Sequence, residues 1–164
     1  MELLANILRP EKLSDVIGQS HLVGDGKVIS NLIHTKVLFS VILYGPPGTG
    51  KTSIASAIVH ELNMTYRTLN AVVNKKEDVD IVIEEAKMNG SMILVMDEIH
   101  RMNKDKQDLL LPCLESGLLT LIGMTTSNPY HKINPAIRSR CQIFKLEPLT
   151  NDDIYIGLKR AVLC

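Results

Sequence analysis

The chain has 164 residues, 45% hydrophobic and 22% charged, which suits one globular domain with its own core. Its 18 lysines and arginines balance 18 aspartates and glutamates, so any nucleic-acid surface must be local rather than a property of the whole chain. Two phenylalanines, four tyrosines and no tryptophan argue against a platform on which single-stranded bases stack.

The cysteines and the amino terminus indicate the compartment. Cys113, Cys141 and Cys164 form an odd, scattered set, which argues against disulfides or zinc and favours a reducing environment. The five histidines show no metal-ligand spacing, and none is assigned a role. No apolar run approaches signal-peptide length or the ~20 residues that span a bilayer. The sequence therefore predicts a soluble protein of the cytoplasm.

Strand and helix patterns alternate along the chain from residue 26. In chain order they predict a helix at 28–35, a strand at 40–44, a helix at 52–62, a strand at 66–70, a helix at 77–89, a strand at 92–96, a helix at 104–116, strands at 119–125 and 142–146, and a helix that starts at 150–153. This alternation predicts an α/β fold, in which a parallel sheet is covered by helices.

A glycine-rich segment, GPPGTGKT at 45–52, fits the pattern G-x-x-x-x-G-K-[S/T] between a strand and a helix. Glycines let backbone N–H groups turn towards phosphate oxygens, and the helix that follows adds the positive end of its dipole. Lys51 would reach the β- and γ-phosphates, and the Thr52 hydroxyl would bind Mg²⁺. A plain glycine-rich turn is the less favoured alternative. The predicted nucleotide contacts are Pro47, Gly48, Thr49, Gly50, Lys51 and Thr52.

The run ILVMDEIHR at 93–101 places two carboxylates directly after a buried strand. Ligands in α/β folds bind at the carboxyl edge of the sheet. Asp97 would hold Mg²⁺ through water, and Glu98 would orient or deprotonate the attacking water. A strand that ends in solvated acids explains the pair equally well on its own, but the upstream phosphate-binding segment favours the functional interpretation.

Two further polar groups follow in the chain. The cluster TTSN at 125–128 ends a strand, where Asn128 would hydrogen-bond the γ-phosphate or the attacking water, although such clusters usually mark turns. A short helix capped by Asn134 and led by Pro135 is predicted to carry both Arg138 and Arg140. No acidic residue lies within several positions of these arginines, so they are either solvated or held for an anion.

With these motifs in this order, the chain resembles the AAA+ ATPases from about residue 8 to residue 160. The segment LRPEKLSDVIGQSHL at 8–22 is similar to the amino-terminal segment of clamp-loader-like and Holliday-junction-motor members. The segments at 97–117 and 122–149 are most similar to the replication-associated recombination ATPases, whose eukaryotic relative is the Werner-interacting ATPase. The resemblance implies a P-loop NTPase domain at 1–149 with its sheet between helices, and the start of a truncated helical lid at 150–164.

The resemblance also implies residue roles. Asp97 and Glu98 match the Walker B pair, Asn128 matches the first sensor, and Arg140 matches the arginine finger that reaches a neighbouring subunit's nucleotide. Arg138 is expected to brace that interface or to be solvated. The residues that fall where such proteins contact the base are Leu8, Arg9, Val16 and Ile17. The family usually reads ATTEN where this chain reads MTTSN at 124–128, but Asn128 is retained.

The implied function is an ATPase, with ATP and Mg²⁺, that maintains DNA at stalled replication forks. The resemblance implies a homo-oligomer that acts on forked or single-stranded DNA near a single-stranded-DNA-binding protein, close to the nucleoid. Without a complete lid, the 164-residue chain is expected to hydrolyse ATP slowly and to be mainly monomeric. The alternatives are a clamp-loader subunit or branch-migration motor, and a nucleotide-dependent interaction module without hydrolysis. The basic groups at 75–76, 101–106 and 159–160 are expected to be solvated faces.

Overall fold

A computed structural model describes residues 10–36 and 39–163 of the chain. Two predicted base contacts, Leu8 and Arg9, lie outside the described residues. The described chain divides into two compact units. We call residues 39–45 and 64–145 the sheet unit, and residues 10–36, 46–63 and 146–163 the helical unit.

The sheet unit contains a five-stranded parallel sheet in the order β2-β3-β4-β1-β5. Its strands are β1 (Val41–Tyr44), β2 (Tyr66–Asn70), β3 (Met92–Asp97), β4 (Leu119–Thr125) and β5 (Gln142–Lys145). The parallel sheet and all five strands confirm the predictions, with ends that differ by at most one residue. The carboxyl ends of the strands therefore meet at one edge, where segments 97–98 and 125–128 emerge.

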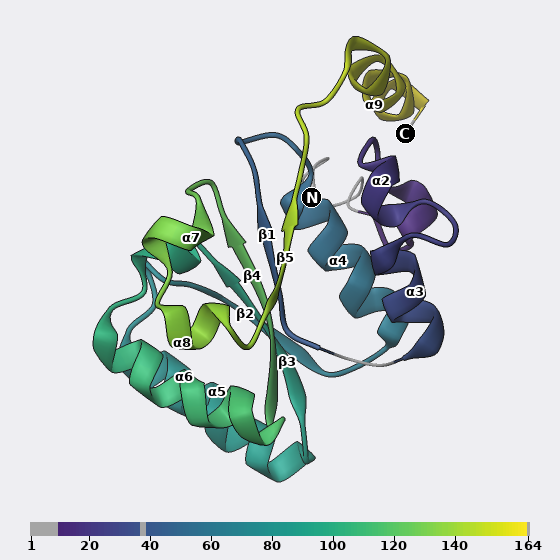
Figure 1. The fold of residues 1–164 in the computed structure, drawn as a ribbon. Coiled ribbons are helices and arrows are strands. Elements are labelled where there is room, and N and C mark those ends of the chain that lie inside the picture. Colours follow the sequence, from purple (N-terminus) through teal and green to yellow (C-terminus); the bar gives the residue numbers. More distant parts are fainter. Residues whose placement is uncertain (1–9, 37–38, 164) are drawn as a thin grey trace. The chain divides into compact units, whose positions relative to one another are not determined.

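Helices of the sheet unit pack on one face of the sheet (Figure 1). They are α5 (Lys76–Asn89), the 3₁₀ turn η2 (Ile99–Arg101), α6 (Lys104–Ser116), α7 (Pro129–Lys132) and α8 (Pro135–Arg138). The core on this face includes Leu94 and Leu121 from the strands, Val82 from α5 and Leu110 from α6. The intervening strand residues are buried too, which explains why these strands have continuous apolar sequences rather than alternating ones.

Side-chain hydrogen bonds cap the amino-terminal ends of α5 and α6, the two long helices of the sheet unit. The Asn103 side chain accepts a 3.0 Å hydrogen bond from the Lys106 N–H, which confirms the predicted N-cap of α6. At the start of α5, the Asp78 carboxylate accepts two hydrogen bonds, one from the backbone N–H of Lys75 and one from the side-chain amide of Asn74. These two bonds hold the pKa of Asp78 below its usual range.

Lys106 is a buried cation, although the sequence predicted a solvated one. Its side chain extends from α6 towards the segment after β2, where the ammonium donates to the Ala71 carbonyl at 2.9 Å and the Asn74 carbonyl at 2.5 Å. Only 7% of Lys106 remains exposed. The prediction is wrong because the carbonyls that solvate the ammonium lie more than thirty residues upstream in sequence.

We expect Lys106→Met to lower the free energy of unfolding by about 2–4 kcal/mol, since two carbonyls lose a charged donor. The control is Lys104→Met, which changes an exposed lysine in the first turn of the same helix and should shift stability by less than about 0.5 kcal/mol. Urea unfolding followed by circular dichroism measures both. Equal midpoints for the two variants would contradict the structural role of Lys106.

The helical unit contains η1 (Leu13–Asp15), α2 (Ser20–Val23), α3 (Val28–Thr35), α4 (Lys51–Leu62) and α9 (Asn151–Leu163). Helix α9 begins with a reciprocal cap, in which the Thr150 hydroxyl accepts from the Asp153 N–H at 3.1 Å and the Asp153 carboxylate accepts from the Thr150 N–H at 3.0 Å. This confirms the predicted start of the last helix. Among the described residues, no helix is long and apolar enough to cross a bilayer.

Candidate functional site

The glycine-rich segment begins at the carboxyl edge of the sheet. The backbone N–H of Gly45, directly after β1, donates to the Thr125 carbonyl at the end of β4 at 3.2 Å. The chain then passes through residues 46–50 into α4, which confirms the strand–loop–helix context that the sequence predicted.

Positive φ angles shape this loop. Gly48 has φ 78° and Gly50 has φ 102°, values that only glycine adopts without strain, while a Cβ at either position would meet no atom within 4 Å. The glycines are therefore needed for backbone conformation rather than for space. The Thr49 hydroxyl and the Lys51 ammonium each donate to the Pro46 carbonyl at 2.9 Å. Thr52 is exposed in the first turn of α4.

A buried glutamine supports the loop, and sequence reasoning missed it. The Gln19 amide donates to the Thr49 carbonyl at 2.9 Å and to the Glu147 carbonyl at 2.6 Å, and its oxygen accepts from the Glu147 N–H at 2.9 Å. Gln19 thus ties the loop to the segment that leads into α9. No sequence motif marks such a residue. The preceding Gly18 indicates a turn, and in the structure both Gly18 and Gln19 have positive φ.

Two predicted base contacts lie in the helical unit. Val16 is buried and Ile17 is half-buried, in the segment between η1 and α2. Gly157 of α9 faces this segment, since a Cβ on it would stand 3.2 Å from the Ile17 Cδ1. A cavity of about 790 Å³ opens beside the same segment, and Val16, Gly18 and Thr150 contribute to its lining. Its size is within the range of small-ligand sites.

Asp97 and Glu98 stand at the end of β3, as predicted. Glu98 has φ 54°, an uncommon angle for a residue with a side chain, and its N–H donates to the Asp97 Oδ1 at 2.8 Å. Strained backbone of this kind is concentrated at functional sites. The Glu98 side chain is 40% exposed.

Asn128 lies beyond β4 and caps α7. Its Oδ1 accepts from the Tyr130 N–H at 3.0 Å, so the oxygen is occupied and the side-chain NH₂ is the end that can serve a ligand. An NH₂ group donates hydrogen bonds, which suits phosphate oxygens. The short helix α7 was not predicted, because one turn gives no helical periodicity.

The two arginines have different environments in the sheet unit. The exposed Arg140 guanidinium lies 3.5 Å from the Glu115 carboxylate of α6, an acid 25 residues away in sequence. Arg138 donates to the Tyr130 carbonyl at 2.8 Å and lies 5.6 Å from the centre of the Tyr130 ring. Arg138 is therefore braced within its own chain rather than simply solvated. Burial raises the pKa of the neighbouring Cys141 to about 12, so this thiol stays protonated.

The ligand atoms available for Mg²⁺ are oxygens. The described residues contain no group of three or more His, Cys, Asp or Glu side chains that could hold a metal. Magnesium is usually bound by one or two protein oxygens together with phosphates and water. The exposed Thr52 hydroxyl and the Asp97 carboxylate each offer an oxygen of this kind.

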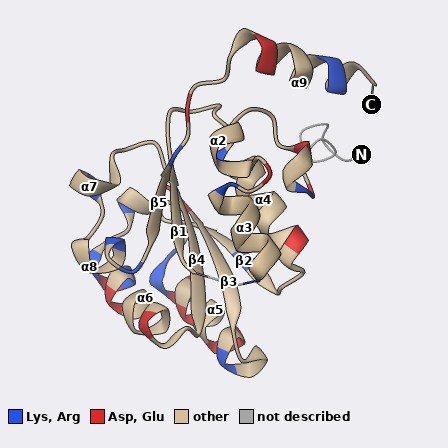
Figure 2. Ribbon diagram, turned by 45° about the vertical axis from the view of Figure 1, so that its right-hand side comes forward, with Lys and Arg blue, Asp and Glu red and all other residues tan. Residues whose placement is uncertain are grey.

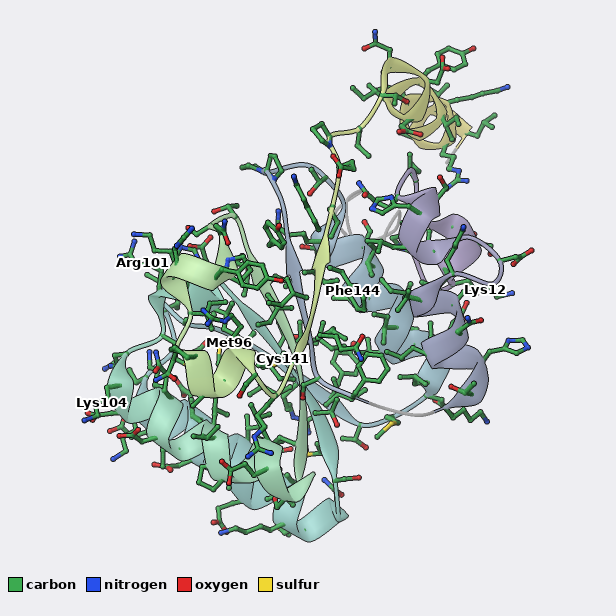
Figure 3. All side chains as sticks on the ribbon, viewed as in Figure 1. Lys12, Met96, Arg101, Lys104, Cys141 and Phe144 are labelled. Atoms are coloured by element: carbon green, nitrogen blue, oxygen red, sulfur yellow. The ribbon has the colours of Figure 1, made fainter. Side chains whose placement is uncertain are left out.

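The remaining basic residues are mixed with acids. Acidic and basic residues lie close together along α6 (Figure 2), and Arg101 and Lys104 lie at the outer edge of the sheet unit (Figure 3). Both side chains are exposed, as predicted for solvated faces.

Similarity to known proteins agrees with this fold. Residues 41–149 match the ATPase family associated with various cellular activities (AAA). The chain is 57% identical to replication-associated recombination protein A of Bacillus subtilis over 99% of its own length and 38% of that protein. It is 42% identical to the ATPase WRNIP1 of Dictyostelium discoideum over 97% of its length and 19% of that protein. The chain thus spans well under half the length of these curated relatives.

Among solved structures, the Thermotoga maritima RuvB Holliday junction branch migration motor matches with a TM-score of 0.81 and 30% identity. The match covers 95% of this chain and 54% of that one. It confirms the predicted AAA+ type of P-loop fold. The chain therefore belongs to the AAA family of ATPases, which bind nucleotide and hydrolyse ATP, and it is related to replication-associated recombination protein A.

Proposed function

We propose that this chain is the ATP-hydrolysing domain of a protein that maintains DNA at stalled replication forks. The observation that carries the proposal is the 57% identity, over almost the whole chain, to a protein named for replication-associated recombination. The likeness to RuvB favours a branch-migration motor as the second candidate, but the identity there is 30%.

The loop residues of the helical unit bind the phosphates in this proposal. The positive φ angles of Gly48 and Gly50 support it, because they turn backbone N–H groups inward in such loops. Lys51 exchanges the Pro46 carbonyl for the β- and γ-phosphate oxygens of ATP. Thr52 and Asp97 would each supply an oxygen to Mg²⁺, which would neutralise phosphate charge.

The strand ends of the sheet unit act on the reacting phosphate. Glu98 orients the attacking water and accepts its proton, and the NH₂ group of Asn128 donates to the γ-phosphate or to that water. Arg140 donates to the γ-phosphate of ATP bound by a neighbouring subunit. The exposure of Glu98 and Arg140 supports these roles, because each side chain can reach a ligand.

The remaining assignments extend the same proposal. Leu8, Arg9, Val16 and Ile17 contact the base. Residues 1–149 form the nucleotide-binding domain, and residues 150–164 begin the lid. The full-length protein is a cytoplasmic, nucleoid-associated homo-oligomer that works on forked or single-stranded DNA with a single-stranded-DNA-binding protein. Weak hydrolysis and a monomeric state are expected for the 164-residue chain alone.

The experiment that tests this function compares steady-state ATP hydrolysis by the full-length protein with and without forked DNA. We expect forked DNA to raise turnover, and Glu98→Gln to retain ATP while losing hydrolysis, since the amide cannot accept a proton from water. Wild-type turnover in the Glu98→Gln variant would remove Glu98 from the mechanism. Tight ATP binding without any turnover in the wild type would indicate the interaction module instead.

A further inference from the structure

A histidine without an assigned role lies two residues beyond Glu98. His100 sits in the 3₁₀ turn η2, and its side chain is 12% exposed. Its Nε2 lies 3.7 Å from the Glu98 Oε2, and its Nδ1 lies 2.8 Å from the Thr125 Oγ1. The imidazole thus stands between the predicted water-orienting carboxylate and the last residue of β4.

The two neighbours of the His100 ring, Thr125 and Glu98, together favour one protonated ring nitrogen. The Thr125 hydroxyl oxygen accepts from the Ser127 N–H at 3.0 Å. Its own proton has two acceptors within reach, the His100 Nδ1 at 2.8 Å and the Ser127 carbonyl at 3.4 Å. With the hydroxyl as donor to Nδ1, the Nε2 proton points towards the Glu98 carboxylate, which accepts hydrogen bonds, so this arrangement serves both contacts of the ring. The neutral imidazole then carries its proton on Nε2, which is the nitrogen nearer Glu98.

Close packing holds this part of the chain in place. Ile99 is 2% exposed, and its Cδ1 would stand only 2.7 Å from a Cβ on Gly123 in β4. Glycine at this position lets η2 lie directly against the strand. The Arg101 N–H also donates to the Glu98 carbonyl at 2.8 Å. The backbone that carries Glu98 and His100 is therefore fixed relative to β4.

We propose that His100 is a positioning residue for Glu98, and this rests on the role of Glu98 under the proposed function. The Thr125 hydroxyl holds His100 in the Nε2–H tautomer, and that N–H gives the Glu98 carboxylate a directional donor. At 3.7 Å the contact is longer than a hydrogen bond, and the 40% exposed Glu98 side chain closes it by rotation. The orientation of Glu98 is thereby linked to the strand end that leads to Asn128.

Nitrogen NMR of the nucleotide-free chain tests the tautomer independently of catalysis. Long-range ¹H–¹⁵N correlation spectra distinguish a protonated Nε2 from a protonated Nδ1. We expect the Nε2–H form in the wild type and in Thr125→Ser, which keeps the hydroxyl, and a clear move away from it in Thr125→Val. A protonated Nδ1 in the wild type, or the same spectrum in Thr125→Val, would overturn the proposal.

Kinetics of the full-length protein test the effect on Glu98. We expect His100→Ala and Thr125→Val to lower kcat by about 10–100-fold with little change in KM, as for other groups that orient a reacting residue. His100→Gln, which keeps a side-chain N–H donor, and Thr125→Ser should recover part of this loss. The control is His60→Ala, which removes an exposed histidine in the last turn of α4 and should leave kcat unchanged.

A double substitution separates this inference from the proposed function. In the Glu98→Gln background, adding His100→Ala should not lower the residual rate of hydrolysis further, as measured in a single turnover with excess enzyme, because His100 acts through Glu98. An additional loss of the same size as in the wild type would show that His100 acts elsewhere. If Glu98→Gln alone hydrolyses ATP at the wild-type rate, the role of Glu98 fails, while the NMR result still reports the tautomer.

Discussion

Replacement of Arg140 by alanine in the full-length assembly is expected to keep ATP affinity near the wild-type value and to abolish most hydrolysis. An arginine supplied to the transition state by a partner accelerates hydrolysis by about 10³–10⁵-fold in other NTPases. The Arg140 guanidinium is half exposed, and its pair with Glu115 is a surface ion pair of the kind that contributes little to stability. It is therefore available to a phosphate, whose oxygens match the fork of N–H donors.

A mixing experiment tests whether Arg140 acts on the nucleotide of a neighbouring subunit. Subunits with Arg140→Ala and subunits with Lys51→Ala are each expected to be inactive alone. Mixed oligomers should recover some activity, since some interfaces pair an intact phosphate-binding loop with an intact arginine. Glu115→Gln is the control, because it removes the resting partner of Arg140 and keeps the arginine. No recovery at any mixing ratio, with mixed oligomers demonstrated, would contradict action between subunits.

The regular elements could be predicted because their signals are local. The run at 92–96 is entirely apolar, and the run at 104–116 has helical periodicity between Asn103 and Gly117, so both elements have the predicted starts. The single-turn elements η1, α2, η2 and α7 could not be predicted, since three or four residues establish no period.

The features of the site that could not be predicted depend on contacts between residues far apart in the sequence. Lys106 is buried because carbonyls of the segment after β2 solvate it, and Gln19 supports the loop through Thr49 and Glu147, which lie 30 and 128 residues away. His100 gains its partner Thr125 only when β4 pairs with β3. Residue type and spacing along the chain carry no trace of such pairs.

Lys51→Ala is the second change with a large expected effect. The lysine side chain supplies the point charge that pairs with the β- and γ-phosphates, and no other side chain of the loop at 46–50 is cationic. The loss of charge-assisted hydrogen bonds to a polyanion should weaken ATP–Mg²⁺ binding by at least about 100-fold. The fold should survive, because the bond from the ammonium to the Pro46 carbonyl lies at the surface.

Calorimetric titration of ATP–Mg²⁺ into the 164-residue chain, its Lys51→Ala variant and its Lys12→Ala variant tests nucleotide binding at the glycine-rich loop most directly. Lys12 is an exposed lysine of the same helical unit and serves as the matched control for charge. We expect measurable binding to the wild type and to Lys12→Ala, and none to Lys51→Ala under the same conditions. Equal affinity of the wild type and a folded Lys51→Ala variant would contradict the assignment of the loop.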